Sequence, residues 1–131
     1  MFEFIKKLLG FTKGYRRYSV SQQTEDRIKS DWIKIDELLR LRSPSQLRQA
    51  LISADRSLDQ ALKDIFEGET MGERLKSAND RYERNIYNKI WEAHKIRNNL
   101  VHEAAYEPPY YVVTEAVETF RMALRLLNIK V

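Results

Sequence analysis

Apolar side chains recur at the three- and four-residue spacing of amphipathic helices through most of this 131-residue chain. One helix is predicted from about Thr24 to Arg42, with the apolar positions Ile28, Trp32, Ile35 and Leu39. The next is predicted to begin at Ser43–Gln46, which offers an N-cap serine, a proline at the first helical position and a glutamine at the third. Its apolar face continues to Ile65, and Gly68 is expected to stop it.

The second half of the chain predicts one short and two long helices. Thr70 and Glu73 form a capping box for the short helix, and a third long helix is expected to begin near Asn79. Pro108 and Pro109 end everything before them. The run "YYVV" at 110–113 is interpreted as the start of the last helix, because one strand cannot form a sheet. The fold class is therefore all-α, an antiparallel four-helix bundle with short additional helices.

Composition narrows the chemistry. The chain is 43% hydrophobic and 32% charged, which is typical of a folded, soluble protein. It has no cysteine, which excludes disulfides, thiolate zinc sites and cysteine nucleophiles and fits a reducing compartment. No apolar run is long enough to cross a bilayer, and Lys6 and Lys7 interrupt the apolar start, so no secretory signal is expected. A cytoplasmic location is expected on these grounds.

The net charge of +4 is concentrated at the N-terminus. Residues 1–18 hold five lysines and arginines against the single acidic residue Glu3, so this segment accounts for the whole excess, 5 − 1 = +4. Two domains follow from this division: a basic amphipathic N-terminal arm over residues 1–18 and a helical bundle over residues 19–131. The apolar stripe of the arm suits packing on the core of its own domain or in a dimer, or contact with a membrane surface or a partner helix.

An arginine on the apolar face of the third long helix is the most unusual feature of the sequence. That face is predicted to comprise Ile86, Ile90, Ala93, Arg97, Leu100 and Val101. A buried, unpaired guanidinium would cost several kcal/mol, so Arg97 is either paired inside or faces a cleft or subunit interface. Asn98 and His102 follow along one flank near Trp91, and His94 borders the stripe. The two histidines lie about 12 Å apart along a helix, so no metal site and no cofactor are predicted.

The sequence "RNNLVH", Arg97 to His102, resembles the Arg-x4–6-His motif of HEPN domains, including its place at the end of the third long helix. The resemblance implies a metal-independent endoribonuclease that acts as a homodimer and cleaves RNA in a shared cleft. Arg97 would then bind and stabilise the phosphate, His102 would transfer protons and Asn98 would orient the reacting groups. His94 and Trp91 are the expected substrate-binding residues.

Two other functions stay open. The first is a non-catalytic HEPN-like module for dimerisation or for binding a nucleotide or a partner protein. In that case His102 caps the helix end, and Arg97 bonds to a carboxylate of the second helix such as Asp55 or Asp59. The second is a protein recruited to a membrane surface by residues 1–18.

Overall fold

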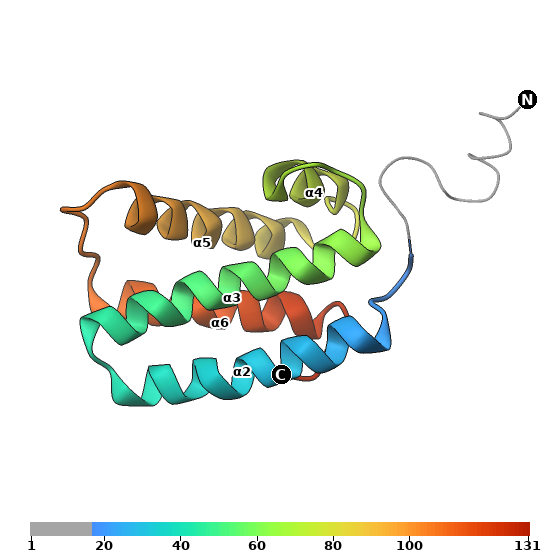
Figure 1. The fold of residues 1–131 in the computed structure, drawn as a ribbon. Helices are drawn as coiled ribbons and strands as arrows, with labels where there is room; N and C mark the ends of the chain where they lie inside the picture. Colours follow the sequence, from blue (N-terminus) through green and yellow to red (C-terminus); the bar gives the residue numbers. More distant parts are fainter. Residues whose placement is uncertain (1–16) are drawn as a thin grey trace, which may run out of the picture.

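A computed structural model describes residues 17–131, and these residues form an all-helical bundle (Figure 1). Its helices are α2 (Gln22–Leu41), α3 (Pro44–Ile65), α4 (Met71–Ser77), α5 (Arg84–His102) and α6 (Tyr110–Arg125). The predicted all-α class is confirmed. Residues 1–16, nearly all of the predicted basic arm, lie outside the described part. None of the described helices is long and apolar enough to cross a membrane.

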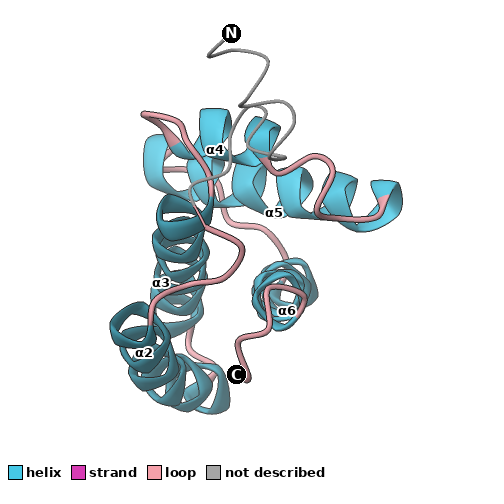
Figure 2. Ribbon diagram, turned by 90° about the vertical axis from the view of Figure 1, so that its right-hand side faces the viewer, coloured by secondary structure: helices cyan, strands magenta, loops and turns pink. Residues whose placement is uncertain are grey.

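Helix α3 is the centre of the bundle. It packs mainly against α2 and α6 and also contacts α4 and α5. Ten of its 22 residues are buried, more than in any other described helix. In Figure 2, α6 is seen almost end-on whereas α5 runs across the view, so these two neighbouring helices cross at an angle. The core is thus organised around a helix that is covered on several sides.

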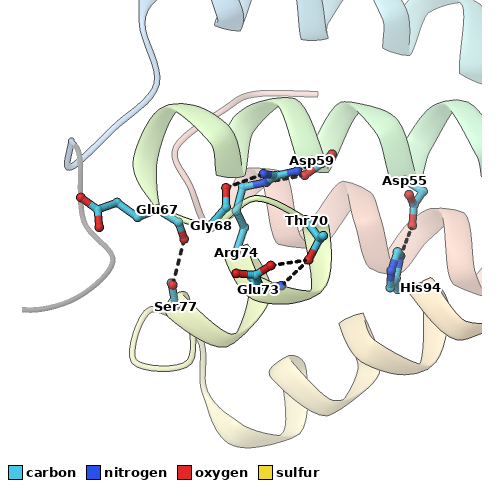
Figure 3. Close-up of polar contacts among 9 residues, drawn as sticks. All are labelled: Asp55, Asp59, Glu67, Gly68, Thr70, Glu73, Arg74, Ser77 and His94. Carbon is cyan, nitrogen blue, oxygen red and sulfur yellow. Dashed lines mark hydrogen bonds and ion pairs between the residues drawn. The ribbon is translucent and has the colours of Figure 1, made fainter.

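Both predicted capping boxes are present. The Ser43 hydroxyl accepts a hydrogen bond from the Gln46 amide at 3.2 Å and donates to the Gln46 side chain at 2.7 Å. The Thr70 hydroxyl accepts from the Glu73 amide at 3.1 Å and opens α4 (Figure 3). Helix α6 begins at Tyr110, which confirms that the "YYVV" run is helical.

Two features of the predicted third long helix are wrong. It begins at Arg84 rather than near Asn79, because the chain makes turns at residues 78–82 and Glu83 is an extended N-cap. Val101 is 43% exposed, although it was placed on the inner face. It lies about 100° around the helix from Leu100, which is where the buried face ends.

The turn after α3 also differs in detail from the prediction. The helix ends at Ile65, and Gly68 serves the turn into α4 with a φ of 148°. A Cβ atom at Gly68 would lie 2.8 Å from the Arg74 backbone nitrogen, so only glycine fits there. Arg74 is buried and secures this turn by donating to the Asp59 carboxylate at 2.8 Å and to the Gly68 carbonyl at 2.8 Å (Figure 3).

A buried tryptophan links α2 to α3. The Trp32 indole nitrogen donates to the Ser57 hydroxyl at 2.9 Å, and that hydroxyl donates to the Ala54 carbonyl at 2.7 Å. Arg121 of α6 lies over the Trp32 ring, with its guanidinium carbon 4.6 Å from the ring centroid. One side chain thereby connects three helices.

We expect Ser57→Ala to lower the free energy of unfolding by about 1–3 kcal/mol, because it leaves the buried indole N–H of Trp32 without an acceptor. Ser53→Ala on the same helix is the matched control, because it removes only the exposed bond from Gln49. Both changes alter helix propensity alike, so urea denaturation of the two variants isolates the buried bond. Equal stability of the two variants would contradict this account.

A carboxylate near the end of α3 anchors the start of α2. The Asp64 carboxylate accepts from the Ser21 amide and the Ser21 hydroxyl, each at 3.0 Å. Burial alone would raise the pKa of Asp64, but hydrogen bonds from Thr24 and from both Ser21 groups, together with the charge of Arg17, lower it. Ionised Asp64 therefore stabilises the folded chain.

The stabilisation by Asp64 should depend on pH. Its folded pKa lies below the unfolded value, so its contribution is present above about pH 4 and is lost as the pH falls through the lowered pKa. We therefore expect Asp64→Asn to unfold at a lower temperature than the wild type at pH 7, with the difference shrinking under acid. Thermal scans between pH 7 and pH 2.5 measure this, and a difference that does not change with pH would refute it.

Candidate functional site

The buried carboxylate of Asp55 is the centre of the polar cluster on α3. Its residue is only 2% exposed. One oxygen lies 2.7 Å from Nδ1 of His94 (Figure 3), and the other lies 3.6 Å from Nε of Arg97. The arginine on the apolar face is thus paired inside the protein, as one of the two alternatives from the sequence proposed. Its partner is Asp55, whereas Asp59 pairs with Arg74.

The guanidinium of Arg97 is anchored at one side and accessible at the other. Nε is buried beside Asp55, and Nη1 donates to the side-chain oxygen of Asn98 at 2.8 Å. The side chain as a whole is 29% exposed, and Nη2 is not one of its buried atoms. No hydrogen bond or ion pair within the described residues engages Nη2. That nitrogen is available to an anion from solvent.

His94 is oriented on two sides. Asp55 holds Nδ1, and the ring of Trp91 stands edge-on to the imidazole with centroids 6.2 Å apart. Trp91 in turn contacts Tyr87 edge-on and packs against the hydrophobic core. The His94 side chain is 12% exposed, so the imidazole lies mostly below the surface with its second nitrogen, Nε2, not engaged by a described residue.

His102 stands apart from this cluster. It is the last residue of α5 and is exposed. Its five-residue separation from Arg97 places it about 140° around the helix and about 7.5 Å along the axis. Within one chain, the structure therefore brings His94 and Arg97 to Asp55, with Trp91 beside His94 and Asn98 beside Arg97. It does not bring His102 to them.

A groove of about 480 Å³ opens at the same end of the bundle as His102. It lies between the turn from α2 to α3 and the loop from α5 to α6, and Arg42, Arg48, Tyr106 and Tyr110 help to line it. Another groove, of about 500 Å³, runs between α5 and α6. None of the five residues predicted for the site lines either groove.

The sequence contained one sign of the groove that Arg42 and Arg48 line. Arg48 and Asp55 are seven residues apart on α3, so they share a helix face, and that face meets α5. Arg48 donates through Nη2 to the carbonyl of Leu100, near the end of α5. The sequence contained no comparable sign that Arg42, in the turn from α2 to α3, would line the same groove as Arg48. Its position depends on how the two loops fold together.

Neither a cluster of metal ligands among the described residues nor a similar protein indicates the function of this chain. Within residues 17–131, no three histidine, cysteine or acidic side chains are grouped to hold a metal ion. Comparison of the chain with protein-family models, with curated proteins and with solved structures finds no significant match.

Replacing Asp55 by asparagine should destabilise the bundle, because an amide carries no charge to balance the Arg97 guanidinium. We expect the free energy of unfolding to fall by about 1–3 kcal/mol. Asp80→Asn is the control, because Asp80 is exposed and makes no ion pair or hydrogen bond with a described residue. Chemical denaturation measures both variants. An Asp55→Asn variant as stable as the control would show that the pairing contributes nothing.

Proposed function

We propose that this protein is a HEPN-like antiparallel four-helix bundle that cleaves RNA without a metal ion, as a homodimer. The observation that supports the proposal best is the way the Arg97 guanidinium is held. Its guanidinium is fixed by Asp55 and Asn98 on the protein side and exposed on the other. A planar, permanently charged fork in this state suits the oxygens of a phosphodiester.

The reaction that fits these residues is internal transesterification. The RNA 2′-hydroxyl loses a proton to a base, its oxygen forms a bond to phosphorus, and the bond to the 5′-oxygen breaks as an acid protonates it. The products are a 2′,3′-cyclic phosphate and a free 5′-hydroxyl. Arg97 stabilises the charge on the phosphate oxygens, Asn98 holds the guanidinium, and His102 transfers protons.

The need for two proton-transfer groups supports a dimer. Each chain offers one exposed histidine at the end of α5, His102, because His94 is bound to Asp55 and mostly buried. A second copy related by a two-fold axis would supply a second His102 and a second Arg97. Because the two residues lie about 140° apart around α5 in one chain, the dimer would place His102 of each copy beside Arg97 of the other. Trp91 and His94 then orient the α5 surface that receives the RNA.

A second candidate is a non-catalytic interaction module. It is favoured by the pairing of Asp55 with both His94 and Arg97, which gives these side chains a stabilising role that needs no substrate. In this case the exposed end of α5 would bind a partner protein or a nucleotide without cleaving it.

The two candidates differ in the behaviour of purified protein with RNA in EDTA. For the nuclease, we expect His102→Ala to lower the cleavage rate by about 10²–10⁴-fold and Arg97→Ala by about 10²–10³-fold. Arg84→Ala, an exposed change at the other end of α5, should leave the rate unchanged. Cleavage is followed on gels that resolve the cyclic phosphate ends.

Folding must be measured on the same samples. If Arg97→Ala and His102→Ala cleave as fast as Arg84→Ala, these residues are not catalytic. If the folded wild type cleaves no RNA but forms a stable dimer, the interaction module is the better description.

A further inference from the structure

Two arginines at the end groove have no carboxylate partner among the described residues. Arg74, Arg97 and Arg121 each pair with an aspartate. In contrast, Arg48 donates to an uncharged carbonyl, that of Leu100, and Arg42 lies over the ring of Tyr110. Because Arg42 and Arg48 line one groove, their charges add there.

The charge balance of the groove favours an anion. Glu107 is the only acidic residue among its lining residues, and it forms no ion pair with either arginine. The groove therefore presents two guanidinium groups against one carboxylate. The first turn of α3 also lies at this groove, at Pro44 and Ser45, with the positive end of the helix dipole.

The same groove offers aromatic surface. Tyr110 is 48% exposed, and Tyr106 is partly buried against the core. The guanidinium carbon of Arg42 lies 5.4 Å from the centroid of the Tyr110 ring. A volume of about 480 Å³ falls in the range of small-molecule sites. Arginines beside tyrosines in a space of this size suit a ligand with a phosphate and a flat ring.

The backbone conformation of Arg42 also marks this residue as unusual. Arg42 is the C-cap of α2 and adopts a left-handed conformation with φ 63°. Glycine is the residue that this position favours, and a larger side chain is strained there. The chain thus holds a long cationic side chain, next to the groove, at a position whose left-handed backbone favours glycine.

We propose that this groove binds a nucleotide unit, with its phosphate on Arg42 and Arg48 and its base against Tyr106 and Tyr110. Leu100, which lines the groove, lies two residues before His102 on α5. The groove and His102 therefore lie at the same end of α5, with Leu100 and His102 about 160° apart around the helix axis. The use of RNA as the source rests on the proposed function, whereas the binding of a nucleotide does not.

The test exploits the backbone of Arg42. Arg42→Gly removes the guanidinium and supplies the residue that a left-handed C-cap prefers, so the melting temperature should rise by a few degrees. Binding should weaken all the same, by about tenfold or more. Arg42→Gln removes the charge alone. Arg40→Gln is the matched control, because Arg40 is exposed on α2 and carries the same charge.

Two probes distinguish the source of the nucleotide. Titration calorimetry with each of the four nucleoside 5′-monophosphates tests the free form, and fluorescence anisotropy with a labelled single-stranded RNA 12-mer tests the polymer. The RNA measurements use the His102→Ala background, so that cleavage does not interfere. Loss of affinity in both Arg42 variants and not in Arg40→Gln, with either probe, supports the proposal.

Affinity in Arg42→Gly equal to that in Arg40→Gln would overturn the proposal, as would no binding of any probe to the wild type. The outcome is separable from that of the proposed function. Nucleotide binding through Arg42 without RNA cleavage would leave this site standing and remove the nuclease. Cleavage that is insensitive to Arg42, with unchanged RNA affinity, would do the reverse.

Discussion

A carboxylate sealed inside the bundle constrains the whole arrangement of α3 and α5. The side chain of Asp55 is 3% exposed, so its charge must be balanced by neighbouring groups and not by water. Among the described helices, α5 alone supplies those groups, through His94 and Arg97, which are three residues apart and therefore on one face of the helix. The position of α5 along α3 is thus fixed by charge as well as by apolar packing.

Helix α3 uses a second carboxylate, that of Asp59, to position α4. Asp59 lies one turn from Asp55 and binds Arg74 of α4, which also closes the turn at Gly68. Two acids at consecutive turns of α3 thereby bind basic side chains from two different helices, Asp55 from α5 and Asp59 from α4 (Figure 3). Their sequence spacing alone is also compatible with a shared metal site, and the structure separates them because each carboxylate has its own cationic partner.

The helices and their caps were predictable because they depend on local rules. Serine before proline at 43–44, the threonine–glutamate pair at 70 and 73, and the apolar periodicity of α3 are each read within a few residues. The start of α5 was misplaced, because the turns at residues 78–82 precede an N-cap, Glu83, that makes no side-chain capping bond. Most of the fold was therefore predictable from local sequence patterns.

The site was less predictable, because its members come from different helices. The sequence indicated that Arg97 required a partner, but only the packing of α3 against α5 selected Asp55 over Asp59. The separation of His102 from Arg97 follows from helix geometry alone and was visible in the spacing. The end groove had one sign in the sequence, the shared helix face of Arg48 and Asp55, but its shape depends on two loops distant in sequence that help to line it.

The turn between α2 and α3 has a consequence for how copies of this protein can associate. Arg42 adopts a left-handed backbone conformation and Ser43 an extended one. Pro44 favours that extended conformation at Ser43, the residue before it. Straightening the two helices into one continuous rod is therefore costly, because Pro44 disfavours a helical conformation at Ser43. Exchange of α2 between chains through such a rod is therefore disfavoured, and an oligomer would join complete bundles through their surfaces.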